Sequence, residues 1–261
     1  MTAGSTWWPT VDLGPAPADA PAAFCADLTP DSLLAGYRAG AFPLPAADQY
    51  ALWMNEARHE DEVAAGTVAA PADEAADGTA YGVAWWCPDP RPVIRPGAAR
   101  IGRRLARRLR RDTAWTTTAD KAFDEVVDRC AHGRSPAWLT AGLRGSLTAL
   151  HARGQAHSAE VWEDGALVGG VFGVRVGAVL SLDSMVGLRP DAARVAVADL
   201  AERFAENGGQ LLDAQWDGPH IRSLGAEPMP RADYLALLRG GGEAGPPPGE
   251  ERPAARLGRP G

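Results

Sequence analysis

The stretch His157-Ser-Ala-Glu-Val-Trp162, continued by Asp164-Gly165 and by Leu167-Val-Gly-Gly-Val-Phe-Gly-Val174, decides the fold of the second half of this chain. Two runs rich in β-branched and aromatic residues around an Asp-Gly pair are typical of a β-hairpin, because Asp-Gly forms the tight turn that joins antiparallel strands. The stretch therefore predicts the first two strands of a sheet.

Working outward toward the C-terminus, the sequence predicts further strands and helices. A strand is expected near residues 178–185, a helix from about Pro190 to Gly208, a strand over Gln210–Gln215 and a last helix over 232–238. Strands followed by a helix that crosses to another strand are typical of an α+β fold with helices on the faces of the sheet.

Toward the N-terminus, four helices are expected. The first runs from Thr29-Pro30 to Gly40, the second over 100–111, the third starts at Thr118, and the fourth runs from Thr140 or Gly142 to Gly154. Three segments lack a convincing period: residues 1–24 are expected to be irregular, 55–80 to form an acidic, solvated insertion, and 241–261 to be a disordered tail. The domains expected are 25–153 and 154–240.

Composition bounds the class of protein. The chain has 261 residues, a net charge of −7 and three widely spaced cysteines, so neither a disulfide framework nor a zinc motif is expected. No apolar run is long enough for a membrane span and no leader pattern is present. We expect a reduced, soluble, cytoplasmic protein in which any nucleic acid binds to a local basic patch.

An arginine-rich segment supplies such a patch. Seven arginines suited to binding phosphates fall between residues 100 and 111: Arg100, Arg103, Arg104, Arg107, Arg108, Arg110 and Arg111. The alternative is an ordinary solvated helix face. Tryptophans can stack on unpaired bases, and Trp85, Trp86 and Trp138 are candidates, although a buried core position is the commoner place for any one of them.

A polar pair marks the late strand 210–215. Side chains two residues apart on a strand share a face, so Asp213 and Gln215 are expected to point the same way. The alternative is a strand end with ordinary polar caps.

Several runs in this order resemble the leucyl/phenylalanyl-tRNA–protein transferase family. They are Leu28–Pro43, Trp85–Arg91, His157–Trp162, Leu167–Gly173, Asp183–Met185, Leu212–Gln215, and His220 with Ser223–Ala226. The resemblance implies an N-terminal α/β portion packed on an acetyltransferase-like (GNAT-like) C-terminal domain. It also implies transfer of Leu or Phe from charged tRNA to the N-terminal amine of an acceptor protein, as in N-degron tagging.

The resemblance also implies roles for individual residues. Asp213 and Gln215 match the catalytic pair, Trp138 matches a residue that contacts the terminal adenosine, and the arginines match basic residues for the acceptor stem. A pocket for the amino acid, or a contact with the acceptor, is implied for Asp183, Ser184, Met185, Val171 and Phe172.

Three departures from the family pattern affect substrate preference. Leu44 replaces an aromatic residue after Phe42-Pro43, Asp183 replaces a glutamate, and Ala141 replaces an arginine.

The reaction class suggests a mechanism without cofactor or metal, because an aminoacyl ester is already activated. We hypothesise that the Gln215 oxygen accepts a hydrogen bond from the attacking amine, while Asp213 accepts one from the Gln215 amide NH2. The expected partners are aminoacyl-tRNA and an acceptor with a free, basic N-terminal residue, with no membrane involved.

Two alternatives remain open. An acetyl-CoA-dependent N-acetyltransferase would need a glycine-rich turn at a helix start to hold the pyrophosphate, and residues 186–193 lack it. A non-catalytic tRNA-binding protein is the other, and the presence of both Asp213 and Gln215 argues against it.

Overall fold

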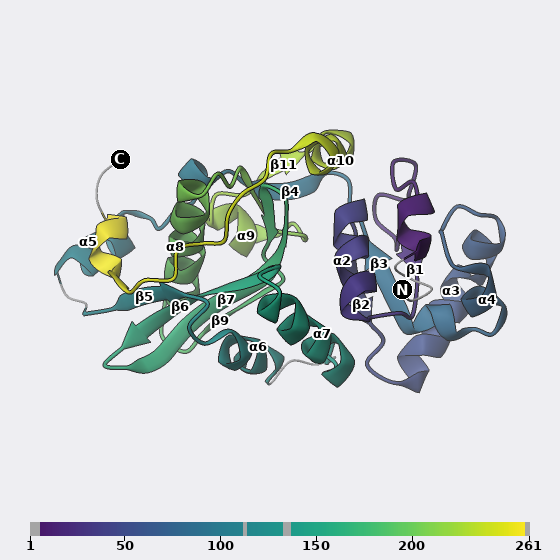
Figure 1. Ribbon diagram of the computed structural model, residues 1–261, viewed down its shortest axis with the longest axis horizontal. Coiled ribbons are helices and arrows are strands. Elements are labelled where there is room, and N and C mark those ends of the chain that lie inside the picture. Colours follow the sequence, from purple (N-terminus) through teal and green to yellow (C-terminus); the bar gives the residue numbers. More distant parts are fainter. Residues whose placement is uncertain (1–5, 112–113, 133–136, 259–261) are drawn as a thin grey trace. The chain divides into compact units, whose positions relative to one another are not determined.

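The computed structural model describes residues 6–111, 114–132 and 137–258, grouped into two compact units (Figure 1). Unit 1 collects Met1–Arg91, Gly133–Leu150 and Met229–Gly240, and unit 2 collects Pro92–His132, His151–Pro228 and Gly241–Gly261. This grouping differs from the expected division at residue 153. The reason is that strands within 92–132 pair into the sheet of unit 2, and a helix near residue 235 joins unit 1.

Unit 1 combines short helices with a three-stranded antiparallel sheet of order β1-β3-β2. Its elements are η1 (Trp8–Thr10), β1 (Ala23–Phe24), α2 (Pro30–Ala39), β2 (Phe42–Pro45), α3 (Gln49–Ala64), α4 (Ala72–Ala76), η2 (Thr79–Gly82), β3 (Val83–Trp86), α7 (Ala141–Ala152) and α10 (Arg231–Gly240). The expected helix after Thr29 is confirmed as α2. Pro30 stands at its first position, and Gly40 ends it with φ at 102°, a conformation that favours glycine.

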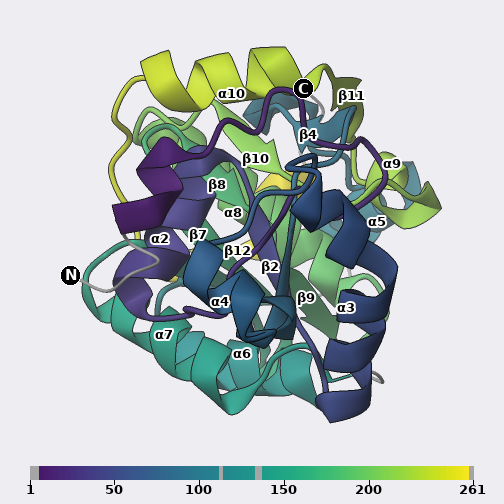
Figure 2. The same cartoon turned by 90° about the vertical axis from the view of Figure 1, so that its right-hand side faces the viewer.

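The acidic segment 55–80 is not the solvated loop that we expected. It contains most of α3, then α4 and η2 (Figure 2). The Asp48 side chain caps α3 by accepting a hydrogen bond from the Ala51 N–H at 2.8 Å. The amphipathic period is weak because the inner face of α3 uses polar residues for contacts. Asn55 donates to the Tyr81 carbonyl at 2.9 Å, and the His59 ring lies against Phe24.

Unit 2 is built on a nine-stranded sheet of order β11-β4-β10-β8-β7-β6-β5-β12, with β9 paired to β7. Its strands are β4 (Arg91–Ile94), β5 (Thr116–Ala119), β6 (Ala156–Glu163), β7 (Ala166–Val176), β8 (Val179–Ser181), β9 (Ser184–Gly187), β10 (Leu211–Asp213), β11 (Glu227–Met229) and β12 (Arg252–Pro253). Its helices are η3 (Pro96–Ala98), α5 (Arg103–Arg111), α6 (Phe123–Ala131), α8 (Ala192–Glu206), α9 (Pro219–Ser223) and η4 (Ala254–Gly258). The chain is therefore α+β, as expected. No described helix is long and apolar enough to cross a membrane.

Helices cover both faces of the β6–β7 hairpin (Figure 1). Neighbouring residues on a strand point to opposite faces, and β7 shows which helix lies on which face. A Cβ at Gly169 would meet Ala192 of α8 at 2.6 Å, whereas a Cβ at Gly170 would meet Val126 of α6 at 2.7 Å. Both helices therefore approach β7 closely, and the main core of unit 2 lies on the α8 side.

The hairpin itself is confirmed. Asp164 and Gly165 both adopt positive φ, 51° and 78°, as a two-residue turn between twisted strands requires. The helix expected from Thr118 begins later, at Phe123, because residues 116–119 pair with β6 as strand β5. These threonines are β-branched, which favours a strand.

The segment after residue 240 is not disordered as far as Gly258. Strand β12 pairs with β5, and η4 packs on α5. Two ion pairs that composition alone does not predict join this segment to α8. Arg252 contacts Glu206 at 2.6 Å, and Arg256 contacts Glu202 at 3.1 Å. The expectation for residues 259–261 lies outside the described residues.

Candidate functional site

The site centres on the end of β10. Asp213 is the last residue of this strand, which pairs with β4 on one side and with β8 on the other. Its side chain is fully buried. The chain then turns sharply, because Gln215 adopts a positive φ of 61°. The Gln215 main-chain N–H donates to Asp213 Oδ1 at 2.9 Å, so the carboxylate stabilises a backbone conformation that is otherwise unfavourable for a non-glycine residue.

The Gln215 side chain turns toward a second carboxylate. Its Nε2 donates to Asp183 Oδ1 at 2.7 Å. The same segments are tied by the main chain, since the Leu182 N–H donates to the Asp213 carbonyl at 2.7 Å. Gln215 is only 6% exposed, and no group among the described residues donates to its Oε1. That oxygen can therefore accept a hydrogen bond from a substrate.

Asp183 reaches this position because the predicted strand 178–185 is interrupted. Strand β7 pairs with β8 through Arg175 and Val176, and with β9 through Gly169–Phe172. Gly173 lies between the two pairings, where a Cβ would stand 1.7 Å from the Ser181 carbonyl oxygen. This close approach requires glycine. It lets the chain leave the sheet after Ser181 and return at Ser184, with Asp183 partly exposed in the connection.

Two expectations about the pair Asp213 and Gln215 are wrong. The residues do not alternate along one strand, because β10 ends at Asp213. The Gln215 amide does not donate to Asp213; it donates to Asp183. Asp183, for which the resemblance implied a contact with the amino acid or the acceptor, orients the amide. Sequence alone could not show this, because 32 residues separate the two partners.

The expected amino-acid pocket is divided between the two faces of the sheet. Val171 pairs with Met185, and Phe172 pairs with Ser184. Directly opposed residues share a face and neighbours along a strand do not. Val171 and Met185 lie with the core on the α8 side, whereas Phe172 packs edge-on against Phe123 of α6. These four residues therefore cannot line a single pocket.

Ser184 is distinguished by its hydroxyl. The residue is 5% exposed, and its Oγ has no hydrogen-bond partner in the described part of the chain. A buried polar group without a partner is costly. Because Ser184 directly follows Asp183, its hydroxyl is a candidate for a contact with substrate.

The tryptophans expected at the adenosine site belong to unit 1. Trp85 is fully buried, and its indole nitrogen donates to the Cys25 carbonyl at 2.9 Å. Its ring packs against Trp8, so Trp85 is a core residue and offers no free face to a base. Trp86 is partly buried against a second small core, and Trp138 is half-buried.

The arginine helix is confirmed over Arg103–Arg111 as α5, with Leu105 and Leu109 buried beneath it. Five of the predicted arginines are exposed and form no ion pair within the described residues: Arg100, Arg103, Arg104, Arg107 and Arg111. They form what we call the arginine face. An exposed row of unpaired guanidinium groups suits phosphate oxygens.

The remaining two arginines make contacts inside unit 2. Arg108 pairs with Asp191 at 3.2 Å, just before α8, and Arg110 donates to the Gly258 carbonyl. The segment before α5 is fixed by Arg194, which donates to the carbonyls of Arg100 and Ser223 at 3.0 and 2.6 Å. Sequence reasoning missed Arg194, because a lone arginine on a predicted helix gives no signal.

One buried carboxylate lies elsewhere in the same unit. Glu160 is fully buried, and this burial raises its pKa above the ordinary 4.5, although hydrogen bonds from Ser158 and Thr118 oppose the shift. The Ser158 hydroxyl donates to Glu160 at 2.5 Å. The Thr118 hydroxyl and the Ala122 N–H also donate to Glu160, so its hydrogen-bond partners come from β5, β6 and the start of α6.

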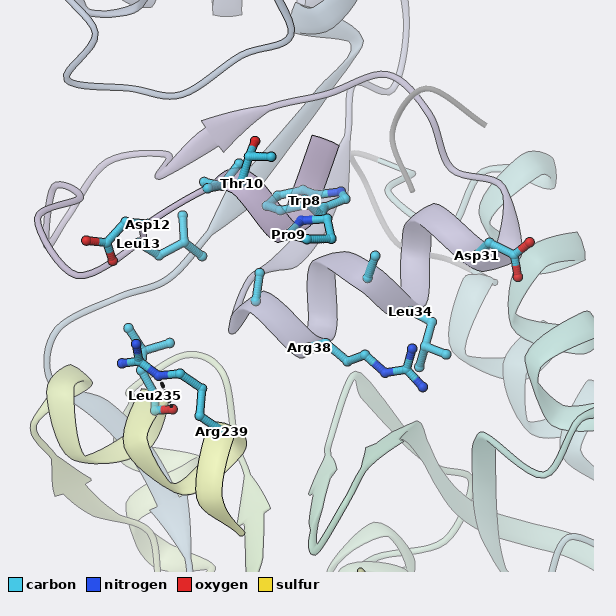
Figure 3. A pocket seen from close by; sticks show the side chains of 13 residues that line it. Trp8, Pro9, Thr10, Asp12, Leu13, Asp31, Leu34, Arg38, Leu235 and Arg239 are labelled. Carbon is cyan, nitrogen blue, oxygen red and sulfur yellow. Dashed lines mark hydrogen bonds between the residues drawn. The ribbon is translucent and has the colours of Figure 1, made fainter. Parts of the chain in front are cut away.

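A hollow of about 700 Å³ lies in unit 1 (Figure 3). Residues of the N-terminal segment, α2 and α10 line it, including Trp8, Leu34, Arg38 and Arg239. It contains none of the predicted site residues.

Comparison with known proteins gives a consistent result. The family model described as leucyl/phenylalanyl-tRNA protein transferase matches residues 93–239, and the model of that family's N-terminal domain matches residues 26–55. A transferase of this name from Xanthomonas euvesicatoria pv. vesicatoria is 35% identical over 90% of this chain and 82% of its own length. One from Xylella fastidiosa is 36% identical over 82% and 76%, and one from Chromohalobacter salexigens is 37% identical over 81% and 71%.

Among solved structures, a GCN5-related N-acetyltransferase from Kribbella flavida has a TM-score of 0.35 and 14% identity over 54% of this chain and 55% of its own. A likeness at that score carries no argument about mechanism. The family assignment rests on the two sequence matches and the relatives: the chain belongs to the leucyl/phenylalanyl-tRNA–protein transferase family.

Proposed function

We propose that this protein transfers leucine or phenylalanine from charged tRNA to the N-terminal amine of an acceptor protein whose first residue is basic, in the cytoplasm, as in N-degron tagging. Family membership supports the reaction class. The observation that carries the proposal for this chain is the hydrogen bond between Gln215 and Asp183, because it leaves the Gln215 oxygen as an acceptor beside a partly exposed carboxylate.

The chemistry needs no further activation of the acyl group. The neutral amine attacks the ester carbonyl, a C–N bond forms, and the ester C–O bond breaks. The leaving oxygen becomes the ribose hydroxyl of the terminal adenosine and takes up the proton that the amine loses. An N-terminal amine has an ordinary pKa of roughly 7.7–8.0, so part of it is already neutral near pH 7. Positioning the two reactants can then supply several kcal/mol, with a ceiling of roughly 7–11 kcal/mol.

Each residue at the end of β10 has a separate task in this proposal. Gln215 Oε1 accepts a hydrogen bond from the amine and aligns its lone pair with the carbonyl carbon. Asp183 holds the amide so that its oxygen, and not its NH2 group, faces the substrate. Asp213 acts through the backbone, because its carboxylate holds the Gln215 N–H. Asp183 and Asp213 are thus positioning residues.

The arginine face is proposed to bind the tRNA. Its guanidinium groups are exposed, and neutralising phosphates releases counterions, which makes binding depend on salt. Since the residues making up this face and Gln215 belong to the same unit, one compact body carries both the basic surface and the proposed reacting end.

An acetyl-CoA mechanism is disfavoured by the start of α8. Cofactor pyrophosphates bind at helix N-termini through free backbone amides and the helix dipole. Here the N-cap is Asp191, whose carboxylate is paired with Arg108 at 3.2 Å. This ion pair occupies the helix start, and residues 186–193 lack the glycine-rich turn that would present free backbone amides to a pyrophosphate.

A transfer assay tests the proposed function. Radiolabelled leucine or phenylalanine on tRNA is incubated with the protein and with peptides that start with Arg, Lys, Asp or Glu. We expect label in the peptides that start with Arg or Lys. Label only in the acidic peptides would contradict the proposed acceptor class, and no label in any peptide would contradict the transfer activity itself. A parallel incubation with acetyl-CoA checks the alternative donor.

A further inference from the structure

Two aromatic side chains stand exposed on α3. Tyr50 is 68% exposed and Trp53 is 58% exposed. They are three residues apart on a helix, so they share one face. Aromatic residues are enriched at protein interfaces, where they supply much of the binding energy. An adjacent exposed pair in a chain with only 7% aromatic residues therefore points to a binding surface.

The same face continues with small and acidic residues. We call it the α3 outer face, and its members, all exposed, follow helical spacing: Tyr50, Trp53, Ala57, Glu60, Asp61 and Ala64. At 1.5 Å per residue the face is about 20 Å long. The aromatic rings lie at the N-terminal end and the two carboxylates toward the C-terminal end. Within the described residues, neither Glu60 nor Asp61 has an ion-pair partner.

The opposite face of α3 holds the helix on unit 1. Leu52 and Val63 pack against the small core around Phe24 and Tyr81. Asn55 donates to the Tyr81 carbonyl. Because these contacts hold α3 (Figure 2) on unit 1, the exposed residues of its outer face stand on a packed helix.

Charge indicates the kind of partner. Residues 48–82 contain eight carboxylates and one arginine, whereas the rest of the chain contains 25 acidic and 25 basic residues. The net charge of −7 thus resides entirely in this segment. Such a surface repels RNA phosphates and attracts cations.

We propose that the α3 outer face docks a cationic segment of the acceptor protein, downstream of its N-terminal residue. In this arrangement Lys or Arg side chains pair with Glu60 and Asp61, and an apolar residue or a guanidinium group packs on Tyr50 and Trp53. This inference rests on the proposed function and assigns the acceptor protein a contact beyond its N-terminal residue.

Direct binding provides a test that does not depend on transfer. A fluorescent 20-residue peptide that starts with Arg and carries Lys and Leu residues is titrated with the protein, and anisotropy is recorded. We expect Tyr50→Ser with Trp53→Ser to weaken binding about tenfold, or about 1.4 kcal/mol, since Trp and Tyr are enriched among the residues that carry interface binding energy. Glu60→Gln with Asp61→Asn should weaken it about threefold and reduce its salt dependence.

A matched control removes the same charge elsewhere. Glu227→Gln with Glu243→Gln alters two exposed carboxylates of unit 2 that make no ion pair among the described residues. This variant should bind the peptide as the unaltered protein does. Equal weakening by the control would show a diffuse charge effect and would overturn the proposal.

Transfer kinetics distinguish a failure of the docking proposal from a failure of the proposed transfer function. For the 20-residue acceptor the outer-face variants should raise KM and leave kcat unchanged, whereas for an Arg-starting dipeptide, which has no downstream segment, KM should stay the same. Unchanged affinity for the long peptide in the aromatic variant overturns the docking proposal even if transfer is intact. A shift from dimer to monomer in the variants, measured by sedimentation, would mean that a second copy covers the face, and would overturn it too.

Discussion

Gln215 Nε2 donates to Asp183 Oδ1 at 2.7 Å, and this single bond joins the turn after β10 to the connection between β8 and β9. An amide has two different ends, so the bond decides which end faces the substrate. In this bond the Asp183 carboxylate oxygen is the acceptor and the amide NH2 group is the donor. The NH2 group is therefore directed to it, and Oε1 is left for the attacking amine.

Replacing Asp183 tests this orientation. Asp183→Ala should lower kcat for transfer by roughly 10–100-fold, because a hydrogen bond to a charged group contributes about 1.5–3 kcal/mol. Asp183→Asn, which keeps a carbonyl acceptor, should retain more activity than the alanine variant. KM for charged tRNA should not change in either. Equal activity of all three proteins in single-turnover transfer would show that Asp183 does not position Gln215.

A glycine substitution tests the interruption of the strand that exposes Asp183. Gly173→Ala should destabilise the protein severely, since the new Cβ would lie 1.7 Å from the Ser181 carbonyl oxygen, which is main chain and cannot move aside easily. Gly145→Ala is the matched control: this residue is in the interior of α7, nothing lies within 4 Å of the added Cβ, and alanine should stabilise the helix by about 1 kcal/mol. Urea denaturation measures both, and similar stabilities for the two variants would contradict the described packing.

The arginine face should determine how tRNA binding depends on salt. Arg103→Ala, Arg104→Ala and Arg107→Ala should each weaken binding and lower the slope of log K against log salt by about one. Arg108→Ala should instead lower stability, because it leaves Asp191 without its ion pair. Filter binding of tRNA at several salt concentrations distinguishes the two classes. An unchanged slope in the first three variants would place the tRNA elsewhere.

Glu160 should make stability depend on pH. Burial raises its pKa in the folded state above the ordinary 4.5, so the folded protein binds this proton more tightly than the unfolded chain does. The contribution is present in full below pH 4.5 and is lost as pH rises through the folded-state pKa. As pH rises above 4.5, the free energy of unfolding of the unaltered protein should therefore fall relative to that of Glu160→Gln. Parallel curves in urea denaturation across this range would refute the role of burial.

The elements with strong local signals were predictable from sequence. The Asp164-Gly165 turn, the proline and glycine at the ends of α2 and the leucine spacing of α5 each depend on residues close together in the chain. The acidic segment was not, because α3 attaches to unit 1 through the polar side chains of Asn55 and His59.

The residues of the candidate site could be predicted from the sequence, but the contacts among them could not. Asp213, Gln215 and Asp183 were all identified, yet the pairing among them depends on a positive φ at Gln215 and on the close approach at Gly173. The first is held by the Asp213 carboxylate, which accepts from the Gln215 N–H, and the second depends on how β7 approaches Ser181 of β8. The faces of Val171 and Phe172 followed from alternation, but their strand partners were needed to show that the expected pocket is divided.

The most direct test of the proposed mechanism is single-turnover transfer by Gln215→Ala, with tRNA binding and unfolding free energy measured on the same sample. We predict a loss of transfer of about 100-fold or more, with tRNA affinity unchanged. Transfer within a fewfold of that of the unaltered protein, in a variant that folds and binds tRNA normally, would contradict the assignment of the Gln215 oxygen as the group that aligns the attacking amine.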